Sequence, residues 1–461
     1  MSSHDANTTG TPGGLGGHNL RRWLTPGIGV KRWLVVVFAG LLLLALGVAH
    51  LVRQATRDFQ PGGAAQVVLD VVTLQFLPYA LRGLLAGVAG VALVGFGAYR
   101  AARALTDPFR SAEGGPLVEL IYQKRFLARG PRIVAIGGGT GLSTLLRGLK
   151  EHTSNLTAIV TVADDGGSSG VLREELGVPP VGDIRRCIAA LADAEPLMSE
   201  LLQYRFPGRP DDPAPEGGGS IGGHAVGNLL IAAMTAVQGG DFEEAIRQMN
   251  RVLAVRGQVL PATATPLNLH AELVDGSVID GQSLIAGSRG IARTWVTPNA
   301  VRASEDALAA IAEAELIVLG PGSLYTSILP SLLLPEIRDA VVASPGLRVY
   351  VCNVATQDGE TSGFDLAAHL EALVAHAGTG IVDAVLANSQ FAARPATDNA
   401  AEPVKLRWPP SVPMPPRLVL DDVIDPENAR RHEPARLATA LLRVYERESP
   451  ARRKSTVART A

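Results

Sequence analysis

The chain has 461 residues, of which 47% are hydrophobic and 19% are charged, and its formal net charge at pH 7 is −2. This balance argues against a general nucleic-acid binder, which carries a clear basic excess. The two cysteines, Cys187 and Cys352, lie far apart among apolar residues, which argues against a disulfide framework and a cysteine-ligated zinc site. We expect both to be buried thiols in a reducing compartment.

The N-terminal quarter carries two long apolar runs. Residues 1–20 are rich in Gly, Ser, Thr and Asn, which predicts disorder. The runs at 33–52 and 79–99 are long enough to cross a ~30 Å hydrocarbon core as helices. A cleaved signal peptide would have a shorter apolar region, of about 7–15 residues. The alternative for the second run is a buried helix of a soluble domain. We interpret residues 21–105 as a two-pass transmembrane hairpin.

Basic residues set the expected orientation of this hairpin. Arginines and lysines cluster before the first run and after the second, whereas the connecting segment balances Arg53 and Arg57 with Asp58 and Asp70. The positive-inside rule then predicts a cell-membrane protein with both termini and the main domain in the cytoplasm. Residues 106–130 are expected to be a linker, and the basic tail at 447–461 is expected to be disordered.

From residue 131 onward, short β-branched runs alternate with helical stretches. Five runs read as buried strands: 132–136, 158–162, 316–319, 348–353 and 384–387. This alternation predicts one α/β domain over 131–446 with a doubly wound, mostly parallel sheet. The segment 267–286 breaks the rhythm, and its Asp275-Gly276 pair predicts a β-hairpin inserted beside that sheet. The segment 207–220 reads as a surface loop.

A glycine-rich turn joins the first predicted strand to an amphipathic helix. Its members are Gly137, Gly138, Gly139, Thr140 and Gly141. Glycines let the backbone approach a ligand, and the N–H groups at a helix start attract anions, so we predict a phosphate site. The turn is not a dinucleotide fingerprint, because Leu142 stands where a glycine or alanine is required. It is not a P-loop either, since no Gly-Lys-Ser/Thr follows. The alternative is a tight turn whose glycines serve geometry alone.

Paired carboxylates follow the second predicted strand. Asp164 and Asp165 fall about 25 residues after the glycine turn, near the place where a Rossmann-type site has its ribose-binding acid. They could instead hold a magnesium ion that bridges phosphates. Ser168 would add a hydroxyl. The alternative is an Asp-Gly turn with a helix cap.

Two further helix starts carry polar candidates. Asp183 precedes an apolar helix, where an ordinary N-cap is the competing interpretation. His224 and Asn228 open another apolar helix, and Asn228 could hydrogen-bond a base or sugar. A lone histidine is more often structural than catalytic, which applies to His224.

Two later strand ends complete the predicted site. The junction after 316–319 offers Gly322, Ser323, Tyr325 and Thr326, and the one after 348–353 offers Asn353 and Thr356. The carboxyl ends of parallel strands share one edge of a sheet, so we expect these groups to converge with the glycine turn at the switch point.

Seven motifs in this order resemble those of one family. They are GGGTGLSTLLRGLK, VTVADDGGSSGVLREELG, PVGDIRR, GGHAVGNLLIAA, GPGSLYTSILP, VYVCNVATQDGET and RHEP. They are similar to the YvcK-like gluconeogenesis factors of the CofD-like superfamily, which includes 2-phospho-L-lactate transferase. The resemblance covers roughly residues 131–445.

The resemblance implies a Rossmann-like CofD fold and binding of UDP-N-acetylglucosamine. It also implies a role in cell shape and envelope synthesis on gluconeogenic carbon sources, with an envelope-synthesis protein as partner. In this branch the positions of Tyr325 and Arg431 are linked to ligand binding. Glu433 stands where the family usually has aspartate, and the membrane hairpin is the largest departure. The sequence is also compatible with a homo-oligomer.

Two functions remain open and a third is disfavoured. A non-catalytic nucleotide-sugar sensor is favoured, because no clear nucleophile–base pair accompanies the motifs. A transferase would move a phosphate-containing group from a nucleotide diphosphate to an alcohol, with Asp164 or Asp165 holding a metal or accepting the hydroxyl proton. A nicotinamide dehydrogenase fails at Leu142 and has no evident hydride-transfer acid.

Overall fold

The computed structural model describes residues 127–192, 195–207, 221–390, 402–407 and 417–448, with isolated positions before residue 82. The chain divides into two units, Met1–Gln123 and Lys124–Ala461, and the description below concerns the second. The predicted N-terminal disorder, the two apolar runs and nearly all of the linker lie outside the described residues, as does the loop at 208–220. No helix in the part of the chain that is described has the length and apolarity to span a bilayer.

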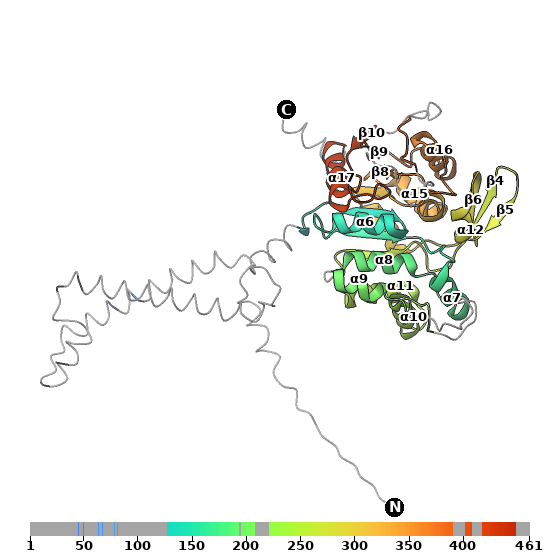
Figure 1. Ribbon diagram of the computed structural model, residues 1–461. Coiled ribbons are helices and arrows are strands. Elements are labelled where there is room, and N and C mark those ends of the chain that lie inside the picture. Colours follow the sequence, from blue (N-terminus) through green and yellow to red (C-terminus); the bar gives the residue numbers. More distant parts are fainter. Residues whose placement is uncertain are drawn as a thin grey trace, which may run out of the picture. The chain divides into compact units, whose positions relative to one another are not determined.

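The second unit is built on a seven-stranded sheet in which every neighbouring pair is parallel (Figure 1). In spatial order its strands are β10 (Arg417–Asp421), β9 (Ala384–Asn388), β8 (Leu347–Val351), β7 (Leu316–Leu319), β1 (Ile133–Gly137), β2 (Leu156–Val160) and β3 (Gln258–Pro261). The predicted doubly wound, mostly parallel sheet is therefore confirmed.

The strand order reverses between β1 and β7. From β1 the chain moves through β2 to β3 at one edge, then returns to pair β7 with the other side of β1, and continues through β8 and β9 to β10. Ile133 is paired with Leu156 on one side and with Leu316 on the other. All five residues of β1 are buried. The carboxyl ends of β1 and β7 thus flank the switch point, where α/β sheets bind ligands.

Helices cover both faces of the sheet, as a parallel sheet requires. One layer contains α6 (Gly139–Leu149), α8 (Gly182–Leu191) and α17 (Pro434–Glu448), with α11 (Phe242–Val252) against β3. The other contains α13 (Glu305–Glu313), α14 (Leu329–Leu332), α15 (Pro335–Ala343) and α16 (Leu366–Ala377). Right-handed crossovers account for this division, since the chain leaves β1 and β7 in opposite directions. In Figure 1, α17, α6 and α8 lie side by side.

Three further helices form a group beside α8, and two of them pack on it directly. They are α7 (Gly167–Leu176), α9 (Glu195–Gln203) and α10 (Val226–Val237). The helix α10 contacts α7, α8 and α9. This group brings the start of α10 beside the starts of α7 and α8.

A small antiparallel sheet lies beside the main one, as the hairpin prediction required. Its strands are β5 (Val278–Asp280), β4 (Asn268–Leu273) and β6 (Ile291–Thr297), in that order, with α12 (Gln282–Gly287) packed on it. The turn between β4 and β5 contains Asp275, whose carboxylate accepts hydrogen bonds from the backbone N–H and the hydroxyl of Ser277. Gly276 in the same turn has φ +83°, a conformation that favours glycine.

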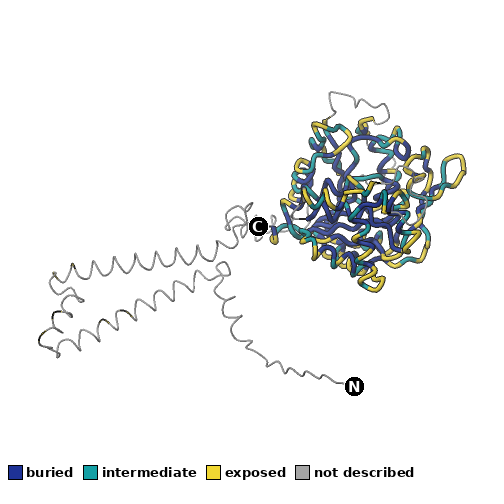
Figure 2. The backbone as a smooth tube through the Cα atoms, turned by 60° about the horizontal axis from the view of Figure 1, so that its bottom comes forward, coloured by how far each residue is buried: buried dark blue, intermediate teal, exposed yellow. Residues whose placement is uncertain are grey.

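Buried residues fill the interior of the second unit, and exposed ones lie on its loops and outer helix faces (Figure 2). Cys187 and Cys352 are free and buried, so the predicted burial of both thiols is confirmed. Burial raises the pKa of the Cys352 thiol to about 12 and that of Cys187 well above its ordinary value.

Candidate functional site

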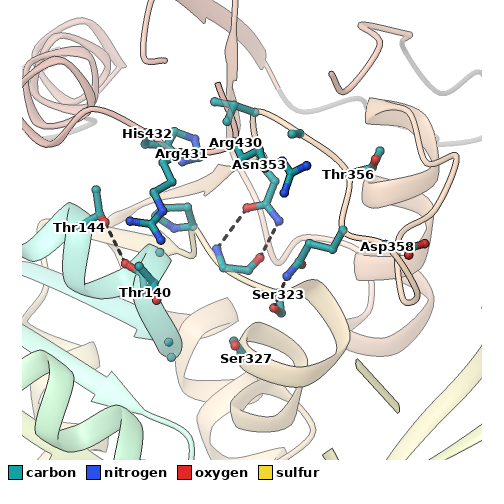
Figure 3. A pocket seen from close by; sticks show the side chains of 18 residues that line it. Thr140, Thr144, Ser323, Ser327, Asn353, Thr356, Asp358, Arg430, Arg431 and His432 are labelled. Carbon is teal, nitrogen blue, oxygen red and sulfur yellow. Dashed lines mark hydrogen bonds between the residues drawn. The ribbon is translucent and has the colours of Figure 1, made fainter. Parts of the chain in front are cut away.

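A pocket of about 430 Å³ opens at the carboxyl edge of the sheet, at the switch point (Figure 3). Its walls are the turn after β1, the loops after β7 and β8, and the segment before α17. The lining residues are Gly138, Gly139, Thr140, Gly141, Thr144, Pro321, Gly322, Ser323, Ser327, Asn353, Val354, Ala355, Thr356, Gln357, Asp358, Arg430, Arg431 and His432. The predicted convergence of the strand ends is therefore present.

The glycine turn forms the first wall. Gly138 is the N-cap of α6 and makes no side-chain capping bond, and the first turn of α6 contains no acidic residue. Its backbone N–H groups and the positive end of its dipole are thus available to an anion. Gly139 has φ +67°, and a Cβ at Gly141 would lie 2.6 Å from the carbonyl oxygen of Pro321. Glycine at position 141 therefore lets the turns after β1 and β7 approach each other.

The loop after β7 forms the second wall and is held by the loop after β8. The Asn353 side chain accepts the N–H of Gly322 at 3.3 Å and donates to the Gly322 carbonyl at 2.9 Å. The Gln357 amide donates to the Ser323 hydroxyl at 2.7 Å. These bonds, drawn in Figure 3, fix the start of the π-helical turn η2 (Leu324–Ile328). Asn353 and Gln357 thus have a positioning role.

The segment before α17 contributes cations to the third wall. Arg431 is exposed, and Figure 3 shows it extending toward Thr140 and Thr144. His432 is buried, and its Nε2 donates to the Cys352 carbonyl at 3.3 Å. Burial lowers the pKa of His432 to about 4, so the imidazole is neutral near pH 7.

A second polar cluster lies behind the glycine turn. A Cβ at Gly138 would be 2.4 Å from Oδ2 of Asp183, and Asp183 pairs with Arg186 at 2.7 Å. Asp164 lies beside it, accepting the N–H of Gly166 at 3.0 Å. Burial raises the pKa of Asp164, and the neighbouring charge of Asp183 raises it further.

Ser168, His224 and Asn228 extend this cluster. The Ser168 hydroxyl bonds to Nδ1 of His224 at 3.0 Å and accepts the Asn228 amide, also at 3.0 Å. All three side chains are buried. They link the starts of α7 and α10 and do not line the pocket.

Three predicted site residues near the glycine turn and the loop after β7 are also absent from the pocket lining. The Tyr325 ring is buried against Phe364 and His376, and burial raises its pKa to about 12. Thr326 is buried in the same turn, and Gly137 is the buried last residue of β1. Each can act on a ligand only through the residues around it.

The predicted pair Asp164 and Asp165 does not converge. The Asp165 carboxylate turns to the N–H and hydroxyl of Ser283, at 2.9 and 2.8 Å. The carboxylate that faces Asp164 is that of Asp183. Within the described ranges, no group of three or more His, Cys, Asp or Glu side chains is arranged to hold a metal ion. Asp165 therefore supports α12 of the small sheet and does not fit a shared magnesium site with Asp164.

Several lining residues were not among the predicted set. Thr144, Ser327, Gln357, Asp358, Arg430 and His432 line the pocket in addition to the predicted residues. Thr144 lies one helical turn after Thr140, whose carbonyl accepts its hydroxyl at 2.9 Å, so helical spacing was the available signal. Gln357 and His432 lie within sequence motifs that had been singled out.

Behind the second wall lies a buried carboxyl group, that of Glu360, with 2% of its surface exposed. The hydroxyls of Ser323 and Thr326 are near enough to lower its pKa, but burial dominates and raises the pKa to about 7. Neither carboxyl oxygen has a partner in full hydrogen-bond geometry among the described residues. Glu360 lies within the motif VYVCNVATQDGET, but no buried carboxyl group was predicted there from the sequence.

Comparison with known proteins explains this architecture. Residues 133–408 match the model of a family described as 2-phospho-L-lactate transferase CofD. The gluconeogenesis factor of Bacillus subtilis is 51% identical over 262 residues, which are 56% of this chain and 79% of the relative. A Nostoc protein, provisionally given the same name, is 44% identical over 432 residues, 92% of each chain. This chain belongs to the CofD family, in its gluconeogenesis-factor branch.

A solved structure supports the same assignment. A Bacillus halodurans protein, determined by X-ray crystallography, superimposes with a TM-score of 0.61 at 42% identity and covers 68% of this chain and 100% of its own. The CofD-family match begins at β1 and so includes the glycine turn, Asp164, Asp183, and the loops after β7 and β8.

Proposed function

We propose that the CofD domain binds a nucleotide sugar, UDP-N-acetylglucosamine, and acts as a regulatory factor. The main observation in support of this proposal is the start of α6, which has no side-chain cap and opens into a 430 Å³ pocket with Arg431 on its far wall. A diphosphate suits this arrangement, because backbone N–H groups and a guanidinium both bind phosphate oxygens. The volume falls within the ~300–1,000 Å³ range of small-molecule sites.

The chemistry of the pocket lining favours binding over catalysis. His432 is buried and neutral, and it bonds to a backbone carbonyl. Asp358 bonds to Arg289, which lowers its pKa. Among the lining residues that the structure describes, no hydroxyl accompanies a base as a nucleophile would require.

A transferase is the second candidate, and one observation favours it. Asp183 lies directly behind Gly138, and Asp164 lies next to Gly182. The raised pKa of Asp164 suits a carboxyl that accepts a hydroxyl proton. Such an enzyme would use a nucleotide-diphosphate donor at the glycine turn and an alcohol near Asp164.

The proposal includes a cellular setting that rests on the sequence. Two apolar runs support tethering to the cell membrane with both termini and the CofD domain in the cytoplasm. The names of the relatives support a role on gluconeogenic carbon sources. Within this proposal the domain acts on cell shape and envelope synthesis through a protein partner. The proposal is also compatible with self-association of the chain. A reporter fused after Ala461 should be active only in the cytoplasm; periplasmic activity would overturn the topology.

Isothermal titration of the full-length chain with UDP-N-acetylglucosamine tests the binding proposal. We expect saturable heat that Arg431→Gln weakens about 10-fold or more, since a charge-assisted phosphate contact contributes ~1.5–3 kcal/mol. Arg251→Gln, an exposed position on α11, should bind as the wild type. An absence of heat with this ligand, together with tight GDP binding, would replace the regulatory factor with the transferase.

A further inference from the structure

The helices α6, α7, α8 and α10 begin at one place. The start of α6 meets that of α8 where Gly138 approaches Asp183, and a Cβ at Gly182 of α8 would lie 2.7 Å from the Ser169 hydroxyl of α7. The start of α7 meets that of α10 through Ser168 and Asn228. Their N-caps make no side-chain capping bond and are Gly138, Gly166, Val181 and Ala225. Several positive dipole ends therefore face one small volume.

One cation is buried at this junction. Arg185 is 4% exposed, and its Cγ and Cδ lie 2.8 Å from where a Cβ of Gly227 would be. The arginine stem therefore crosses the first turn of α10, and glycine at position 227 leaves room for it. Nε and Nη1 of Arg185 have no hydrogen-bond partner among the described residues. Buried charges are normally paired, because an unpaired one loses its hydration without compensation.

The surrounding charges do not supply a dedicated partner. The pKa of Arg185 is lowered to about 10, and burial is the main cause. Arg186 and Arg205 also lower this pKa, and their combined effect is larger than the opposite effect of Asp183 and Asp164. Asp183 is already paired with Arg186 at 2.7 Å. Asp164 has a raised pKa and accepts the Gly166 N–H at 3.0 Å. No ion pair of Arg185 is formed within the described part of the chain.

Other polar atoms at the same junction also lack partners. Asn228 gives its amide N–H to Ser168, but its Oδ1 is buried and unbonded. The hydroxyl of Thr161 is also buried and unbonded, and the methyl carbon of the same side chain lies 3.2 Å from where a Cβ of Gly138 would be. A group that carries both acceptor oxygens and a hydroxyl would satisfy these atoms together with Arg185. Protonated phosphate and the monoanion of a phosphate monoester have both features in one group, and a nucleotide sugar has them in its diphosphate oxygens and its sugar hydroxyls.

We propose that Arg185 and the first turns of α7, α8 and α10 form a second binding site, for an oxyanion of the phosphate class, behind the glycine-turn pocket. The oxyanion pairs with the Arg185 guanidinium and accepts from backbone N–H groups at the helix starts. It belongs either to the nucleotide sugar or to a separate phosphorylated molecule. The site goes beyond the proposed function and does not depend on the identity of the nucleotide.

Titration of the full-length chain with inorganic phosphate, in the absence of nucleotide, tests this site. Saturable binding is expected in the wild type, with at least a 10-fold loss in Arg185→Met. Arg251→Met, at an exposed position on α11, should retain phosphate binding and controls for the loss of one positive charge. Equal phosphate affinity in Arg185→Met and the wild type, or no saturable phosphate binding in the wild type, would overturn the proposal.

Thermal unfolding separates a binding role from a structural one. Among the described residues the Arg185 charge has no dedicated partner, so Arg185→Met should melt at the same temperature as the wild type or higher, and phosphate should raise the melting temperature of the wild type alone. A lower melting temperature for ligand-free Arg185→Met would assign Arg185 to structure and overturn the site.

A parallel titration with UDP-N-acetylglucosamine identifies the source of the oxyanion. Weakened nucleotide-sugar binding in Arg185→Met, with phosphate competing in the wild type, assigns the phosphate to that ligand. Unchanged nucleotide-sugar binding assigns it to a separate molecule. A wild type that binds phosphate but no UDP-N-acetylglucosamine would refute the proposed function and leave this site standing.

Discussion

Glu360 gives the sharpest test of the electrostatics behind the pocket. Burial raises its pKa from 4.5 to about 7, so the folded chain holds this proton more tightly than the unfolded chain. Each pKa unit corresponds to ~1.36 kcal/mol, so the shift is equivalent to about 3 kcal/mol. The stability that comes from the protonated carboxyl is fully present below pH 4.5 and is lost as pH rises to about 7.

Glu360→Gln keeps the shape of the side chain and removes the charge. We expect the variant to exceed the wild type in free energy of unfolding by about 3 kcal/mol at pH 8, and by less than ~0.5 kcal/mol at pH 4.5. Urea unfolding of the full-length chain at both pH values, followed by tryptophan fluorescence, measures the difference. Glu313→Gln, at an exposed position on α13, controls for the general effect of removing a carboxylate.

One result would refute this reasoning. If Glu360→Gln were no more stable than the wild type at pH 8, the pKa of Glu360 in the folded chain would lie near its ordinary value, because hydrogen bonds would stabilise the buried carboxylate. The hydroxyls of Ser323 and Thr326 and the backbone N–H of Thr326 would be the donors, because these groups lower its pKa. Burial would then not be the dominant influence on the pKa of Glu360.

Three further predictions concern the pocket and the core. Gly141→Ala should weaken UDP-N-acetylglucosamine binding about 10-fold or more by titration, because its Cβ would lie 2.6 Å from the Pro321 carbonyl; Gly287→Ala has open space and should bind normally. Tyr325→Phe should bind UDP-N-acetylglucosamine like the wild type. Tyr325→Ala should lose this binding together with ~3–5 kcal/mol of the free energy of unfolding in urea, because the ring is buried. Equal loss of binding in both variants would instead indicate a direct role for the hydroxyl. Cys187 and Cys352 should resist alkylation by N-ethylmaleimide at pH 8 until the chain is unfolded, because both thiols are buried and have raised pKa values. Mass spectrometry measures the labelling, and rapid labelling of the folded chain would contradict this prediction.

The central strands were predictable from sequence and the edge strands were not. β1, β2, β7, β8 and β9 are continuous apolar runs, because strands between two helical layers are buried on both faces. β3 and β10 form the edges, and β10 has no fully buried residue. β10 has half-exposed side chains, and β3 is short, with Gln258 and Pro261 at its ends, so neither strand shows a long apolar run in the sequence. Both were therefore outside the predicted set.

The site divides in the same way between local and long-range information. A glycine turn before a helix is a local feature, and so Gly138–Gly141 and the loop after β7 were predictable as pocket walls. The direction of a side chain depends on distant contacts. Asp165 turns to Ser283, 118 positions along the chain, and Tyr325 packs on Phe364 and His376. The spacing of residues along the sequence predicts neither of these contacts.

Orphaned buried polar groups connect the two halves of the site. Of the described residues with unbonded buried side-chain atoms, Thr161 and Asn228 lie behind the glycine turn with Arg185, while Gln357 lines the opposite wall and Glu360 lies behind it. Buried polar groups are bonded in most folded proteins, because an unsatisfied one costs about 1–3 kcal/mol. Several unsatisfied polar groups on both sides of one pocket lower the free energy of unfolding of the ligand-free chain. Ligand binding at the pocket offsets this loss of stability. For this reason Arg185→Met and Glu360→Gln should shift stability in the same favourable direction, although the first acts by removing a buried cation and the second by removing a buried carboxylate.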